Sequence, residues 1–211
     1  MAKYGVYIIE FLRKKDKYFD GEALHHIITL AKIPTKYKWI NNVEEFKAAL
    51  KDFKETNYRY LHISCHANEF GIELNGELIL NHEVEEFTKK YLTNKRLFLS
   101  ACKGANRDLA SKIIMGNNAW SLLGMPIQLR FIKSALFWPS FYHLINEIDS
   151  KKMLRNDIVE IVKKCVDIFD IPVNYYCRIE ESKTHIRRLK IRQGINTDNR
   201  RIKSTMTKIS N

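Results

Sequence analysis

The chain has 211 residues, of which 45% are hydrophobic and only four are proline. This length and composition favour a globular protein with one substantial core over a disordered chain. No uninterrupted apolar stretch approaches the roughly 20 residues that span a bilayer, and the first residues, MAKYGVYIIEFLRKKDK, lack the small-residue cleavage site of a secretory signal. We therefore expect a cytoplasmic protein with no membrane partner.

The formal net charge of +12 is concentrated at one end of the chain. Residues 182–211 contain nine lysines or arginines and one acid, Asp198, which leaves 27 basic and 23 acidic residues in the rest of the chain. We divide the chain into a domain at 1–180 and a basic tail at 181–211. A solvated, partly disordered extension is the simplest interpretation of the tail. Contact with nucleic acid, docking to an acidic protein, or an edge strand formed by HIRRLKIRQG are the alternatives.

The first half of the chain alternates strand-like and helical patterns. Apolar, β-rich runs predict strands at 5–12, 37–40 and 58–64. Helices are expected between them, the first capped by Asp20 and the second by Asn42.

Residues 71–80, GIELNGELIL, predict a β-hairpin that turns at Asn75-Gly76 and decorates the surface. Asn81 is a candidate cap for a third helix. Strands are expected at RLFLSAC and AWSLLGMP, with a helix near 107–115 between them.

After Pro126 the pattern is helical, with an interruption at Pro139, a long amphipathic helix around 154–168, and a last strand, VNYYCRI, that could pair with a second copy through a sheet edge. Strands that alternate with helices and are apolar on both faces indicate a mostly parallel sheet covered on both sides. We predict an α/β fold, a three-layer α/β/α sandwich with a small hairpin insertion.

Two strand-like segments end in reactive side chains. LHISCHAN ends at His66 and LFLSACKG at Cys102. The carboxyl ends of neighbouring parallel strands meet at one edge of a sheet, so imidazole and thiol are expected to lie close together. An imidazole can take the proton of a thiol and later protonate a leaving amine, which is the chemistry of acyl transfer. Gly104 is expected to let the backbone turn sharply after the cysteine.

LHISCHAN followed by LFLSACKG resembles the His and Cys motifs of caspase-like cysteine peptidases, in particular the bacterial CHAT-type branch, and LLGMPIQLRFIKSALFWPSFYHLI is also similar to that family. The resemblance covers about residues 4–148. It implies that Cys102 is the nucleophile, that His66 is the base, and that the amides of Ala67 and Cys102 form an oxyanion hole. It also implies that no metal or organic cofactor is needed.

The family usually has glycine where this chain has Ala67, so a positive φ at that position would strain the backbone. Family members that cleave after Asp use arginines in the pocket for the residue before the cut, and members that cleave after Arg or Lys use acids. The candidates here are Arg13, Asp20, Gln128 and Arg130.

Other interpretations of the same residues remain open. Cys102 and His66 taken singly are ordinary core or polar residues. Zinc ligation is an alternative for His62, Cys65, His66 and Cys102, although the alternation of a strand points Cys65 away from the histidines. The aromatic cluster of Phe131, Phe137, Trp138, Phe141 and Tyr142 is better explained as core than as a substrate groove. Cys165 is expected on the apolar face of its helix.

We therefore expect a cysteine endopeptidase that acts on protein substrates. By family analogy it serves as a regulated effector in a bacterial stress or antiviral defence system, with a separate regulatory or sensor protein. The alternative is a catalytically silent α/β binding module that holds nucleic acid or a partner protein through its basic tail.

Overall fold

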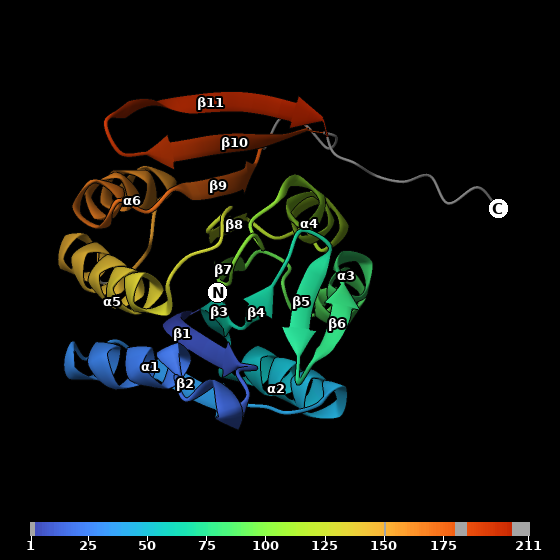
Figure 1. Ribbon diagram of the computed structural model, residues 1–211. Helices are drawn as coiled ribbons and strands as arrows, with labels where there is room; N and C mark the ends of the chain where they lie inside the picture. The colour runs from blue at the N-terminus through green and yellow to red at the C-terminus, as the bar shows by residue number, and fades with distance from the viewer. Residues whose placement is uncertain (1–2, 150, 180–184, 204–211) are drawn as a thin grey trace.

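The fold is built on one twisted eight-stranded sheet (Figure 1). The computed structural model describes residues 3–149, 151–179 and 185–203. The strand order is β11-β10-β9-β8-β7-β3-β1-β2. The strands are β1 (Lys3–Glu10), β2 (Thr35–Trp39), β3 (Tyr58–Ser64), β7 (Arg96–Ser100), β8 (Ser121–Gly124), β9 (Val173–Arg178), β10 (His185–Arg192) and β11 (Ile195–Lys203).

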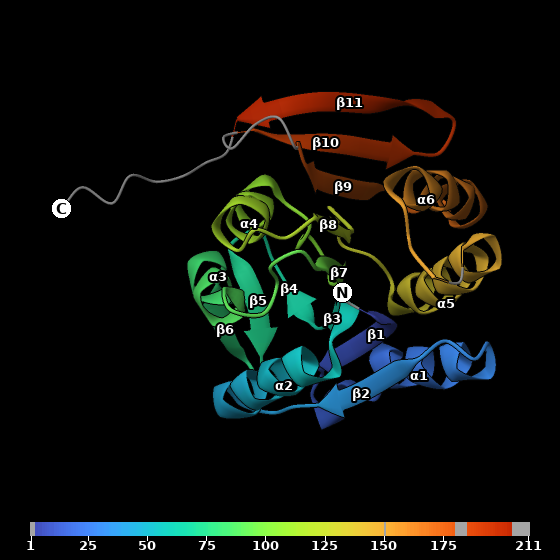
Figure 2. The same cartoon turned by 180° about the vertical axis from the view of Figure 1, so that it is seen from behind.

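The pairings from β2 through β8 are all parallel, whereas β9, β10 and β11 run antiparallel to their neighbours. Helices cover both faces of the sheet, as Figures 1 and 2 show from opposite sides. The predicted three-layer α/β/α fold with a mostly parallel sheet is confirmed. The expected neighbours β3 and β7 are directly paired, with Ser64 opposite Ser100.

Each face of the sheet has its own apolar core. One core is formed with α1 (Asp20–Leu30), α5 (Phe131–Ile148) and α6 (Arg155–Phe169). The other is formed with α2 (Val43–Thr56), α3 (Asn81–Thr88), α4 (Arg107–Ser111) and the adjoining turn η2 (Lys112–Gly116). Among the helices of the described residues, none is both long and apolar enough to cross a membrane.

The predicted hairpin is present as β5 (Gly71–Leu74) and β6 (Glu77–Leu80), and β4 (His66–Ala67) extends it to three antiparallel strands. Asn75 and Gly76 both have positive φ, 51° and 95°, which matches the predicted two-residue turn. The prediction of a surface decoration was incomplete, because Ile72, Leu74 and Ile79 are buried in the core beneath α3. The hairpin is therefore anchored where β4 leaves the main sheet.

One of the three predicted helix caps is correct. Asn42 accepts a hydrogen bond from the Glu45 amide at 2.8 Å. Asp20 and Asn81 do not cap their helices: the Asp20 carboxylate accepts hydrogen bonds from side chains of β3 and β7, and the Asn81 amide donates to Asp108. Both side chains are buried, so tertiary hydrogen bonds replace the local cap.

The predicted interruption at Pro139 was wrong, because α5 continues through that residue. Proline removes one backbone donor from a helix, but Trp138 and Phe141 on either side are buried in the core and hold the helix in place. The interpretation of this aromatic cluster as core is confirmed for Phe137, Trp138, Phe141 and Tyr142. Phe131 differs, because it lines a cavity at the sheet edge.

Residues 185–203 of the basic tail form β10 and β11 and complete the main sheet, so this part is not a solvated extension. Leu189 and Ile191 of β10 are buried against the α6 side of the core. β9 is paired on both sides, which means that VNYYCRI cannot serve as the sheet edge proposed for dimerisation; the edges are β2 and β11. The alternation in HIRRLKIRQG correctly predicted a strand, but the prediction of an edge strand was wrong, because β10 is paired with both β9 and β11.

Candidate active site

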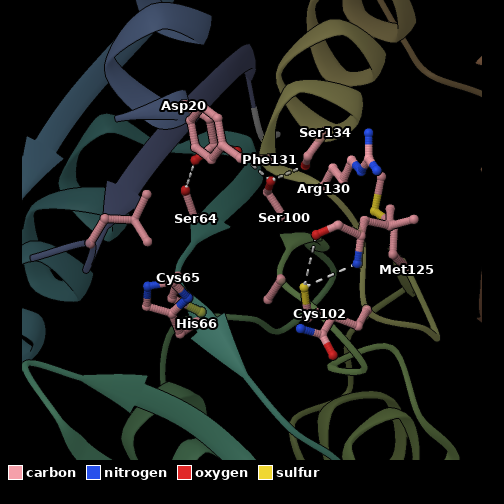
Figure 3. A pocket seen from close by; sticks show the side chains of 14 residues that line it. Asp20, Ser64, Cys65, His66, Ser100, Cys102, Met125, Arg130, Phe131 and Ser134 are labelled. Carbon is pink, nitrogen blue, oxygen red and sulfur yellow. Dashed lines mark hydrogen bonds between the residues drawn. The ribbon is translucent and has the colours of Figure 1, made fainter. Parts of the chain in front are cut away.

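His66 and Cys102 leave the sheet side by side. Ser64 and Ser100 are opposite each other at the ends of β3 and β7. His66 and Cys102 follow two residues after these serines, so both lie at the carboxyl ends of neighbouring strands. Figure 3 shows both side chains at one end of the same pocket. The predicted meeting of the two strand ends is therefore present, and both residues are accessible to a ligand in that pocket.

The pocket is a cavity of about 210 Å³ with polar groups at one end and apolar walls. It is formed by the loops after β1, β3, β7 and β8 and by the first turns of α1 and α5. Its lining residues are Leu12, Asp20, Ser64, Cys65, His66, Ser100, Ala101, Cys102, Met125, Gln128, Leu129, Arg130, Phe131 and Ser134.

His66 has a carboxylate partner. Its Nε2 lies 3.1 Å from Oδ2 of Asp16, which ends the short helix η1 (Lys14–Asp16) after β1. Partial burial alone would raise the pKa of Asp16, but hydrogen bonds from Arg13 and His66 outweigh it, and the pKa of Asp16 is lowered. An ionised carboxylate only accepts, so the neutral imidazole carries its proton on Nε2. Nδ1 is then the basic nitrogen.

Cys102 is held by the loop after β8. Its Sγ accepts a hydrogen bond from the Leu129 amide at 3.4 Å and lies 3.9 Å from the Leu129 carbonyl oxygen. Among the described residues, Leu129 and not His66 is the hydrogen-bond partner of this sulfur.

The turn after Cys102 was expected at Gly104, but the residue with the left-handed backbone is Lys103. Lys103 has the left-handed conformation, with φ of 57°, and its amide donates to the Ile127 carbonyl at 3.2 Å. Gly104 is needed for close packing rather than for a positive φ, because a Cβ there would lie 2.5 Å from Cδ2 of Leu99. The glycine therefore lets the turn pack onto β7 and fixes the direction in which Cys102 leaves the strand.

Ala67 is not strained. It lies in the extended strand β4, opposite Ile72 of β5, so the positive φ that would have penalised alanine does not occur. Alanine at this position therefore has no backbone cost. The oxyanion role of the Ala67 and Cys102 amides stays a prediction.

The far end of the pocket is a buried acidic network. Asp20 is 7% exposed and accepts hydrogen bonds from the hydroxyls of Ser64 and Ser100, the latter at 2.6 Å, and Ser100 also contacts Ser134 at 2.7 Å. Burial raises the pKa of Asp20. Behind it, Glu10 is fully buried, and burial together with the charge of Asp20 raises the pKa of Glu10 to about 7.

The four predicted pocket residues have different positions. Asp20, Gln128 and Arg130 line the cavity, with Arg130 at its exposed rim. Arg13 does not: its guanidinium pairs with Asp16 at 3.3 Å and with Glu73 at 2.9 Å, outside the cavity. Arg13 therefore supports the partner of His66 and does not border the pocket.

The zinc alternative receives no support from the geometry. His62 faces α5, where its Nδ1 lies 3.1 Å from the Tyr142 hydroxyl, and burial lowers its pKa to about 3. Cys65 is buried in the opposite core, and burial raises the pKa of its thiol. No three His, Cys, Asp or Glu side chains within the described ranges are arranged to hold a metal ion. Cys165 is buried on α6, as expected.

Sequence reasoning missed Asp16, Ser64, Ser100 and Ser134. Asp16 lies in a lysine-rich loop, KKDK, which suggested only a solvated surface. The two strand-end serines were visible as matching positions in LHIS and LFLS, two residues before the histidine and the cysteine. That shared offset was the available signal. Ser134 is brought in by the start of α5, which no local pattern indicated.

No protein-family model matches the chain, and no curated protein sequence matches it significantly.

Proposed function

We propose that this chain is a cysteine endopeptidase of the caspase-like type, in which Cys102 attacks the peptide carbonyl and His66 transfers protons. The observation that carries the proposal is that an accessible thiol and an imidazole oriented by a carboxylate line one cavity at the carboxyl edge of a parallel sheet. Ligands and reactive groups gather at this edge in open α/β sheets.

Asp16 completes the arrangement as a positioning residue. By accepting a hydrogen bond from Nε2–H, it fixes the tautomer and the ring orientation of His66, and it stabilises the imidazolium that forms when His66 takes a proton. Arg13 in turn holds Asp16 through its backbone amide, at 2.8 Å, and its guanidinium.

The reaction then follows in two steps. His66 takes the proton of the Cys102 thiol, the thiolate attacks the carbonyl carbon, and the carbonyl π electrons move to oxygen; when the tetrahedral intermediate collapses, the C–N bond breaks and His66 gives that proton to the leaving amine. In the second step His66 takes a proton from water as the water oxygen attacks the thioester carbon; the C–S bond then breaks, the carboxylic acid product leaves, and His66 returns the proton to the Cys102 sulfur. Sγ must leave Leu129 to engage His66, so we propose that substrate or a regulatory protein draws the loop at 127–130 away.

The same cavity supports a preference for lysine or arginine before the cut. Asp20 is deeply buried, with Glu10 behind it, and an anionic side chain would meet both carboxyl groups. A long side chain with a cationic end can pack along the apolar walls and donate to Asp20. Arg130, which would suit an acidic substrate, lies at the exposed rim and is screened by solvent.

The test is cleavage of a proteome-derived peptide library, with and without host lysate, read by mass spectrometry. We expect cuts with wild type and with Cys165→Ala, the buried-cysteine control, and none with Cys102→Ala. Identical cuts with Cys102→Ala would disprove the assignment of the nucleophile. An absence of Cys102-dependent cuts in both settings would favour the binding-module alternative.

A further inference from the structure

A second cavity lies at the opposite edge of the sheet from the candidate active site. It has a volume of about 550 Å³ and is bordered by the starts of β7 and α6, by β10, and by Trp120 just before β8. Three arginines line it, Arg96, Arg155 and Arg187, each from a different element. A single carboxylate, that of Asp157, lies in the same lining. The cavity therefore concentrates positive charge.

Two of the three arginines are held by neutral groups. Arg96 donates to the Ser121 and Tyr175 hydroxyls at 3.0 and 3.2 Å, and Arg155 donates to a backbone carbonyl at 2.9 Å. Within the described residues, none of the three cavity arginines forms an ion pair with a carboxylate. The Nε of Arg96 is buried and, in the described part of the chain, has no hydrogen-bond partner. Such a site is suited to an anion that can accept several hydrogen bonds.

The hairpin of β10 and β11 extends this charge beyond the cavity. Arg187 is directly opposite Arg201, and Arg188 is directly opposite Arg200. β10 itself carries four basic side chains and no acidic one: Arg187, Arg188, Lys190 and Arg192. A partner with repeated negative charges would match this surface better than a single small anion.

Trp120 favours single-stranded nucleic acid over a duplex or an acidic protein as the polyanion that binds here. It is half-buried in the cavity lining, and the Arg178 guanidinium lies over its ring, 3.8 Å from the centroid. A planar aromatic group with stacked arginine, surrounded by guanidinium groups, is a surface on which an unpaired base can stack while phosphates bind the arginines. A duplex presents no free base face, and the carboxylates of an acidic protein come with no base to stack on Trp120.

We propose that this cavity and the β10–β11 hairpin bind single-stranded nucleic acid, with phosphates on Arg96, Arg155 and Arg187. The site is at the other edge of the sheet from Cys102, so it does not depend on the proposed peptidase activity. On this proposal, the basic residues of β10 bind nucleic acid as part of the sheet surface.

The test is fluorescence anisotropy of the full chain with labelled single-stranded RNA, single-stranded DNA and duplex DNA of about one to two helical turns. The variant is Arg155→Gln/Arg187→Gln. The control with the same charge change is Lys51→Gln/Lys54→Gln, on the exposed face of α2. We expect the cavity variant to bind a single strand at least 10-fold more weakly, the control to change binding less than 2-fold, and the salt slope to fall by about 2 in the cavity variant only.

The results that would overturn the proposal are equal weakening in both variants, no binding of either single strand at low salt, or duplex bound as tightly as the single strand. Competition by polyglutamate as effective as that by the oligonucleotide would assign the surface to an acidic protein instead. Because the competition and the comparison of single strand with duplex use the wild-type chain, they decide the question even when the double variant unfolds. Cys102→Ala should bind normally, which separates this site from the peptidase.

Discussion

The imidazole of His66 is held by the carboxylate of Asp16, with 3.1 Å between Nε2 and Oδ2, across 50 residues of sequence. This contact orients the ring and leaves Nδ1 as the basic nitrogen. Asp16→Asn should keep the size of the side chain but lose the negative charge. On the proposed mechanism we expect kcat to fall by about 10²-fold, with a smaller change in KM.

The control for this change is Asp52→Asn. Asp52 also has a lowered pKa, through Lys36 and Tyr7, but it lies on α2, away from the cavity. We expect the control to retain activity and the acid limb of the kcat profile to move only in the Asp16 variant. A purely structural role for Asp16 would leave the shape of that profile unchanged.

Asp20 should decide which residue precedes the cut. With matched fluorogenic peptides we expect kcat/KM for Lys or Arg to exceed that for Asp by more than 10²-fold, because a buried charge pair is worth several-fold more than an exposed one. Asp20→Asn should reduce this preference by at least 10-fold while a norleucine peptide is little affected. Cys102-dependent cleavage that favours Asp would refute the specificity and leave the peptidase standing.

Much of this arrangement could be predicted from local patterns. β3 and β7 are apolar on both faces, so their positions inside a parallel sheet and the meeting of His66 with Cys102 follow from strand length and order. Asn42 and Asn75-Gly76 make only local hydrogen bonds and turns, and these predictions are confirmed.

What could not be predicted depends on contacts between distant segments. The sequence predicts Asp20 as a helix cap because Asp is common at that position. Instead, its carboxylate accepts hydrogen bonds from the hydroxyls of Ser64 and Ser100, which are 44 and 80 residues away in the sequence. Likewise, Pro139 reads as a helix breaker until the buried aromatic residues around it are in place. Tertiary packing overrides the local preference in both cases.

Gly104 should be intolerant of any side chain. An added Cβ would lie 2.5 Å from Leu99 Cδ2, so Gly104→Ala is expected to destabilise the fold by about 1–3 kcal/mol through overpacking. Leu99→Val shortens the opposing side chain and should recover part of that loss in the double variant. Urea unfolding of the four proteins measures the coupling, and strict additivity of the two changes would contradict the contact.

Ala67 should behave as an ordinary strand residue. Because its backbone is extended in β4, Ala67→Gly relieves no strain, and glycine within a strand costs about 0.5–1 kcal/mol. We expect a small loss of stability by urea unfolding and peptidase activity within about 2-fold of wild type. A marked gain in activity would show that the family glycine is needed at this position for the oxyanion geometry.

The buried carboxyl groups of Glu10 and Asp20 should make the free energy of unfolding depend on pH, and the Asp20→Asn variant should reveal that dependence. Burial and the charge of Asp20 raise the pKa of Glu10 from its usual 4.5 to about 7, and burial raises the pKa of Asp20 itself. A raised folded pKa means that the unfolded chain loses its proton first, so this stability is present below about 4.5 and is lost as pH rises toward 7.

His62 acts in the opposite direction, because its pKa is lowered to about 3 and its neutral form is the stable one above that value. In wild type, the opposing contributions of His62 and of the carboxyl pair partly cancel. The quantity to measure is therefore the difference in free energy of unfolding between Asp20→Asn and wild type. Removing one carboxyl group also lowers the pKa of the other, so this difference should rise by about 1–3 kcal/mol between pH 4 and 8. Asp52→Asn, whose carboxyl has a lowered pKa, should show no such rise. A difference that stays flat across that range would mean that the pKa of Asp20 is not raised in the folded protein and that Asp20 does not raise the pKa of Glu10.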